Sequence, residues 1–162
     1  LDLDPQGNLK GTSKEVSSFN PAFGDSATMP SFDSKTNHYF AKQKRSDRVI
    51  IVDANTGNKL EEINLDLKSA GVVFDDLSDS FIASTGIDGE ELAILDVDHK
   101  AILVFNTRGG YVGKSSLPKD IKLRAQNHYN GLGYTNNLFF IYNESEGEFG
   151  TYYGFRISSK SK

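Results

Sequence analysis

The sequence predicts an all-β fold, and three observations support this prediction. Short runs of β-branched and aromatic residues recur along the chain, each bounded by Gly, Asn or Asp, which is typical of strands joined by tight turns. One hairpin pattern is repeated at several places. No segment carries a sustained helical periodicity. The 162 residues are enough for one domain with a substantial core.

The apolar runs place strands along most of the chain. Helix competes with strand only over residues 60–71, where Leu60, Ile63 and Leu67 fit a helical spacing. Ile63, Leu65 and Leu67 alternate as in a strand, and strand is the preferred interpretation there. The expected strands are residues 38–43, 48–53, 59–65, 79–84, 91–96, 100–105, 110–116, 131–134, 138–142 and 151–157.

The repeated hairpin consists of an apolar strand, a turn with Asp or Asn and Gly, and a second strand. When DPQGNLKGTS (4–13) is aligned with NTRGGYVGKS (106–115), Gly7 matches Gly109. When VIIVDANTGNKL is aligned with AILVFNTRGGYV, Gly57 matches Gly109 as well. A short hairpin loop needs a positive φ, which glycine adopts without a steric penalty. These three glycines are therefore predicted to lie in equivalent turns.

A second pattern, strand, polar turn, strand, precedes these hairpins. It occurs in FDSKTNHYFAK (32–42), in FDDLSDSFIAS (74–84) and, with a shorter turn, in YTNNLFFIY (134–142). Together the two patterns repeat about every 50 residues, which is the sequence signature of a repeat architecture. The expected unit is a four-stranded antiparallel sheet.

The stretch ELAILDVDHKAILVFNTRGGYVGKSSLP (91–118) resembles a blade of NHL-like and related bacterial six-bladed β-propellers. The resemblance implies a partial propeller of about three and a half blades, whereas closed propellers usually have at least four. Missing sequence or another chain is expected to complete it, and the absence of an initiator Met suggests a mature or excised piece. The alternative is a β-sandwich with similar hairpins. The implied blade pieces are approximately 1–16, 28–65, 72–117 and 128–158.

Composition excludes several classes of function. The net charge of −4 argues against nucleic acid as the main partner. Without cysteine the chain has neither disulfides nor thiolate chemistry. No run of about 18 apolar residues is present, so membrane insertion is not expected. The many Asn, Ser, Thr and Tyr residues without Cys resemble extracellular or periplasmic proteins.

Ligands of propellers usually sit where loops enter the innermost strands, and here those loops are residues 23–30, 66–71 and 122–131. The third loop is the richest in binding groups, because it offers a cation, an imidazole, amides and an aromatic ring. That mixture suits a sugar or a small polar anion. The alternative is a polar connecting loop whose side chains make structural hydrogen bonds. The candidate ligand-binding residues are Arg124, Gln126, Asn127, His128, Tyr129 and Asn130.

Metal binding has little support in the sequence. The histidines have no zinc-site spacing. Asp2 and Asp4 resemble the start of an EF-hand loop, but Ser13 occupies the position of the terminal Glu. Asp53 and Asn55 show the same spacing of possible calcium ligands. Turn chemistry explains these residues without calcium, so no cofactor is expected and calcium remains a weak candidate.

The preferred function is a non-catalytic binding or assembly module. It would recognise a protein, a glycan or its own copies, as a homo-oligomer or together with the remainder of a larger propeller. This interpretation follows from the absence of a catalytic motif. The alternative is a propeller-class hydrolase or lyase acting on a lactone or sugar in the central channel. In that enzyme His128 would act as the base and Arg124 as the anion clamp.

Overall fold

The computed structural model describes residues 4–8, 10, 21–24, 30–73, 81–123, 131–143 and 151–157. In these ranges the chain forms eleven strands, a 3-10 helix η1 (Pro21–Phe23) and a short helix α1 (Leu67–Ala70). All strands belong to three antiparallel sheets, which confirms the all-β prediction. No helix in this described part is long and apolar enough to cross a membrane.

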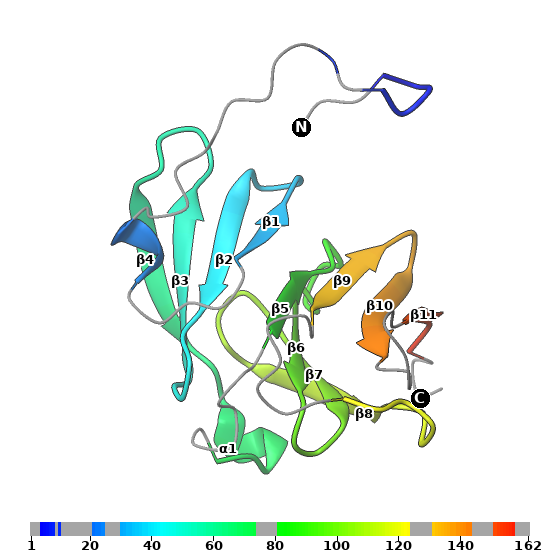
Figure 1. Ribbon diagram of the computed structural model, residues 1–162. Helices are drawn as coiled ribbons and strands as arrows, with labels where there is room; N and C mark the ends of the chain where they lie inside the picture. The colour runs from blue at the N-terminus through cyan, green and yellow to red at the C-terminus, as the bar shows by residue number, and fades with distance from the viewer. Residues whose placement is uncertain are drawn as a thin grey trace.

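Each sheet is a meander in which strands that follow one another in sequence pair with one another (Figure 1). Sheet 1 contains β1 (Ser31–Asp33), β2 (His38–Lys42), β3 (Arg48–Asp53) and β4 (Lys59–Asn64). Sheet 2 contains β5 (Phe81–Ser84), β6 (Leu92–Asp96), β7 (Ala101–Phe105) and β8 (Tyr111–Ser116). Sheet 3 contains β9 (Leu132–Thr135), β10 (Leu138–Asn143) and β11 (Thr151–Phe155).

Sheet 2 lies between the other two sheets and is buried on both faces. On one face Ile94 and Leu103 belong to the same apolar cluster as Ile51 of sheet 1. On the other face Leu95 packs in a cluster with Ile141 of sheet 3. Successive residues of a strand point to opposite faces, so a strand covered on both sides must be apolar throughout. This explains the unbroken apolar runs of β6 and β7.

The first strands of the sheets lie side by side, with β5 next to both β1 and β9. The backbone N–H of Ser84 donates to the hydroxyl of Ser31 at 2.8 Å. At the same end, an ion pair between Lys35 and Asp88 joins the β1–β2 turn to the β5–β6 loop. This arrangement is compatible with stacked blades and with a sandwich.

The repeated hairpin turns are present where the sequence predicts them. Gly7, Gly57 and Gly109 have φ angles of 84°, 72° and 83°. The N–H of Gly7 donates to the Asp4 carbonyl at 2.9 Å, and that of Gly109 to the Asn106 carbonyl at 2.9 Å. The Gly57 turn is one residue longer, since Asp53 donates its N–H to Asn58 while Asn106 donates to Gly110. The positive φ of the three glycines is confirmed, but only the Gly7 and Gly109 turns have the same length.

The strand predictions are confirmed to within two residues, but the second repeated pattern is partly wrong. Residues 81–84 form β5, the first strand of sheet 2, whereas 38–42 form β2, the second strand of sheet 1. The counterpart of β2 is therefore β6, and residues 74–80 lie outside the described residues. The first strand of the pattern at 32–42 is present as β1, whereas the sequence misses the helix α1, which follows the end of β4.

Candidate functional site

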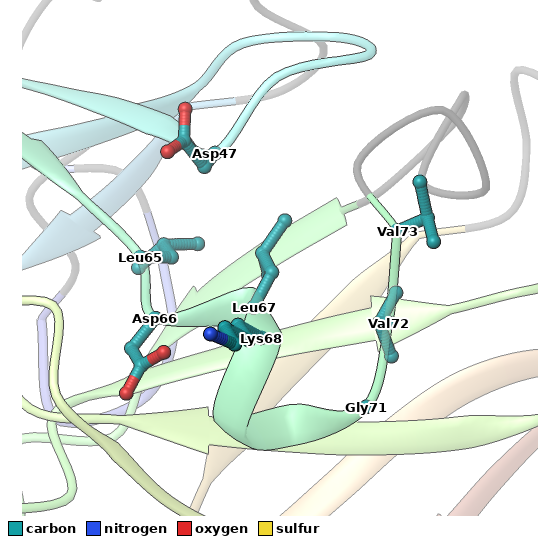
Figure 2. A pocket seen from close by; sticks show the side chains of 8 residues that line it. All are labelled: Asp47, Leu65, Asp66, Leu67, Lys68, Gly71, Val72 and Val73. Carbon is teal, nitrogen blue, oxygen red and sulfur yellow. The ribbon is translucent and has the colours of Figure 1, made fainter.

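A shallow pocket lies where the chain leaves β4 and turns through α1 towards sheet 2 (Figure 2). Its volume is about 490 Å³. The pocket lies in the 66–71 connection, which is one of the three loops expected to carry a ligand. Its lining consists of Asp47, Leu65, Asp66, Leu67, Lys68, Gly71, Val72 and Val73.

Two backbone hydrogen bonds fix the start of this connection. The N–H of Leu65 donates to the Asp47 carbonyl, and the N–H of Asp66 donates to the Gly109 carbonyl, both at 2.8 Å. A side chain at position 109 would place its Cβ 1.9 Å from the Asn64 carbonyl oxygen. Glycine is thus needed there for its positive φ and for the close approach of two backbones.

The single turn α1 is defined by its two ends. The carboxylate of Asp66 caps the N-terminus by accepting the N–H of Ser69 at 3.1 Å. Gly71 has a φ of 71° and donates its N–H to the carbonyls of Leu67 and Lys68, which ends the helix. The sequence DLKSAG therefore encodes this helix through its caps rather than through a long apolar period.

The floor of the pocket is apolar and its rim is charged. Leu65, Leu67 and Val72 are buried in the core between sheets 1 and 2. Val73 on the rim is 59% exposed. Hydrogen bonds from the side chain and backbone of Ser69 lower the pKa of Asp66, which keeps its carboxylate charged at neutral pH.

The lining also contains Asp47, Asp66 and Lys68, and Figure 2 shows the carboxylates of Asp47 and Asp66 pointing to opposite sides. The charge of Asp47 is also close to the ammonium of Lys42. Each carboxylate can attract a cation, and the apolar floor favours an aliphatic group next to it. The sequence analysis named the 66–71 loop but none of these side chains as binding residues. The signal that could have found them is the pair of helix caps, Asp66 and Gly71.

The candidates of the third loop, namely Arg124, Gln126, Asn127, His128, Tyr129 and Asn130, lie outside the described residues. The same holds for Asp2. Of the first loop, the structure describes Phe23, Gly24 and the exposed Pro30; Phe23 and Gly24 pack at the outer face of sheet 1. In the described part of the chain, the pocket involves the second of the three expected loops.

The described calcium candidates stabilise the turns in which they lie. The carboxylate of Asp4 accepts the N–H groups of Gln6 and Asn8 at 2.9 and 2.8 Å. Asp53 accepts the N–H groups of Asn55 and Thr56 at 2.9 and 2.7 Å. In the part of the chain that the structure describes, no group of three or more His, Asp or Glu side chains is placed to hold a metal ion.

The β6–β7 turn contains an Asp–His pair that the sequence analysis did not single out. Asp96 is buried and accepts from the backbone N–H of His99 at 3.1 Å, and its other oxygen lies 2.8 Å from Nδ1 of that imidazole. The imidazole itself is half exposed. The buried carboxylate fixes the orientation of the ring and closes the turn.

The sequence matches no protein-family model and no curated protein. The argument for function therefore depends on the site and the surfaces of the chain itself.

Proposed function

We propose that the chain is a non-catalytic binding module, a propeller-type stack of antiparallel sheets that recognises a short segment of another protein. The binding site is the pocket between β4 and sheet 2. The observation that carries the proposal is the combination of a buried apolar floor with carboxylates on the rim. Three successive meanders with adjacent first strands support the propeller-type architecture.

The chemistry of the pocket selects the class of ligand. Among the lining residues that the structure describes none is aromatic, so this part of the lining offers no ring on which a sugar could stack. The exposed Val73 and the floor residues favour an aliphatic side chain, while Asp47 and Asp66 favour a neighbouring Lys or Arg. A peptide with a basic residue beside a Leu or Ile meets both requirements.

The test is a titration of methyl-labelled protein with the peptide acetyl-Lys-Leu-Lys-amide, followed by NMR. We expect saturable shifts of the methyl groups of Leu67, Val72 and Val73, with a dissociation constant on the order of 1 mM for so small a ligand. Acetyl-Glu-Leu-Glu-amide is the matched control and should cause no such shifts.

Asp66→Asn separates the charge of this residue from its capping role, because Asn also caps a helix but carries no charge. This variant should keep α1 and weaken binding of the basic peptide by about 3–10-fold at low salt. Equal responses to the two peptides, or no response of the pocket methyl groups, would overturn the proposal.

A further inference from the structure

We infer that the outer face of sheet 3 pairs with the same face of a second copy of this chain, forming a two-fold dimer. The strand pairing defines this face. Phe139 and Ile141 of β10 point into the core shared with sheet 2, so the alternate residues point outwards. We call this surface the open face; its residues are Gly133, Leu138, Phe140, Tyr142, Tyr152 and Gly154.

The register arranges the open face in two rows. Phe140 lies opposite Gly133 on one side and Gly154 on the other. Tyr142 lies opposite Tyr152, and their ring centroids are 5.5 Å apart at 65°. The result is a ladder of rings flanked by glycines.

The residues of the open face are uncharged; Gly133, Tyr152 and Gly154 are exposed, while Leu138, Phe140 and Tyr142 are half-buried. Tyr152 is 67% exposed, the largest fraction among the large apolar and aromatic side chains of the described residues. The ring of Phe140 lies over Gly154, where an added Cβ would be 3.0 Å from the ring. At Gly133 an added Cβ would meet only the Cβ of Phe140, at 3.8 Å. That hollow beside a ridge of rings can receive a ring from the second copy.

The interior of the molecule already contains the same kind of contact twice. Sheet 1 packs on sheet 2, and sheet 2 packs on sheet 3, through alternate apolar side chains. A sheet laid on the open face would continue this series with aromatic side chains in place of aliphatic ones. This continuity points to another sheet as the occupant.

The other end of the stack argues that the sheet comes from the same face of a second copy. On the outer face of sheet 1, η1 packs on Ile50 and Val52, with the ring centroids of Phe23 and Tyr39 5.6 Å apart. Ile50 on that face pairs with Glu62, which bonds Arg48 and Lys59 at 3.2 and 2.8 Å. Head-to-tail packing would displace η1 and desolvate these charges. Packing of the open face on the open face of a second copy leaves η1 and these charges undisturbed, and it gives a closed two-fold dimer.

The size of the face sets the strength of association. Three fully exposed aromatic side chains would bury about 450–750 Å² per copy, and Phe140 and Tyr142 are already half-buried, so the area lies below the roughly 800 Å² of a standard stable interface. The dimer is therefore concentration-dependent. It involves none of the pocket residues, so it stands or falls separately from the proposed peptide site.

Sedimentation velocity of the full chain between about 5 and 500 µM tests the inference, since the expected interface area places it among weak complexes. We expect a monomer–dimer equilibrium that Tyr152→Ser weakens at least tenfold. Phe32→Ser is the matched control, because Phe32 is an aromatic residue of sheet 1 that is 47% exposed; it should leave the equilibrium unchanged. Gly133→Arg, which fills the hollow with a charge, should also abolish the dimer. Circular dichroism confirms that each variant folds.

A label measurement identifies the face. The chain has no cysteine, so Thr135→Cys and Glu61→Cys each carry a single nitroxide. The label at position 135 of β9 should show short intermolecular distances in the dimer, and the label at position 61 of β4 should not. A wild-type monomer at 500 µM would overturn the inference. So would a dimer that Tyr152→Ser leaves intact, or one with the labels at position 61 closest. In each case binding of the basic peptide at the pocket would remain an independent result.

Discussion

The two ends of the sheet stack differ in how their outer faces are covered. On sheet 1 the centre of the outer face is covered and Val52 is completely buried, while Phe32 of the edge strand β1 is 47% exposed. Ala22 and Phe23 from η1 pack against this cluster. On sheet 3 the corresponding outer face exposes Tyr152 to 67%. The same kind of sheet therefore ends in a capped face at one side and in an open face at the other (Figure 1).

The difference teaches that a strand's own sequence does not determine what covers it. VIIV in β3 and LFFIY in β10 are both apolar on each face. β3 is covered because the preceding segment folds back on it, and β10 is not covered to the same extent by the described residues. Burial of an outer face is a property of the neighbouring segment, so substitutions at the two ends should have very different effects.

The largest expected effect comes from placing a carboxylate on each outer face. Val52→Asp would bury an unpaired charge under η1 and should lower the free energy of unfolding by about 3–5 kcal/mol. Tyr152→Asp on the open face should change it by less than about 1 kcal/mol, because the new carboxylate stays hydrated. Urea unfolding of both variants, at a concentration where the chain is monomeric, measures the contrast.

Val52→Asn is the control for loss of the apolar side chain alone, and it should be less damaging than the charged variant. Equal destabilisation by Val52→Asp and Tyr152→Asp would contradict the distinction between a capped and an open end.

Sequence reasoning succeeds where the structure depends on local pattern. The strands follow from apolar runs, and the hairpin glycines follow from the need for positive φ. It fails where contacts between distant segments decide. The second pattern predicts β1 and its pairing with β2, but not the hydrogen bond from Ser84 to Ser31 that joins β1 to sheet 2. No local pattern encodes that partner.

The same limit applies to the candidate site. The pocket needs the Asp66 cap, which is local, but also the Gly109 carbonyl from the β7–β8 turn and the Asp47 carbonyl from the β2–β3 turn. These contacts join turns from two sheets. A reading of the chain could identify the 66–71 connection as a candidate loop, but not the side chains that line the pocket.

The second prediction concerns Lys42, the last residue of β2, which precedes Gln43, the residue that bonds η1. Its ammonium is buried and donates to the carbonyls of Gln43 and Ser46. Burial lowers the pKa of Lys42 from 10.5 to about 8, and the nearby charge of Asp47 opposes this shift. The folded state therefore disfavours the charged amine, at an energetic penalty that is fully present below pH 8.

As pH rises from about 8 to about 10.5 the penalty disappears, so the free energy of unfolding should rise by about 3 kcal/mol from this group. Lys42→Met should remove that rise, and Lys44→Met in the β2–β3 turn should not. The measurement is the difference between the stability–pH curves of each variant and the wild type. Parallel curves for wild type and Lys42→Met would contradict the burial of a charged amine.

The smallest expected effect comes from weakening the attachment of η1 to the outer face of sheet 1. The side-chain amide of Gln43 donates to the carbonyl of Phe23 at 2.8 Å and to that of Ala41 at 3.1 Å, which ties η1 to sheet 1. Gln43→Ala leaves both carbonyls without this donor and should lower the free energy of unfolding by about 1–2 kcal/mol. Lys44→Ala, at the exposed neighbouring position, serves as the control.

Gln43→Ala should also make the two ends more alike. When η1 detaches, the apolar residues Ala41, Ile50 and Val52 become accessible, so amide exchange in β3 should accelerate while exchange in β10 stays unchanged. The dye ANS, which binds exposed apolar surface, should bind this variant more strongly than the Lys44→Ala control. Exchange that accelerates equally in both strands would mean that Gln43 stabilises the whole stack rather than its capped end. Acceleration confined to β3 would show that a single amide decides whether the outer face of sheet 1 is covered.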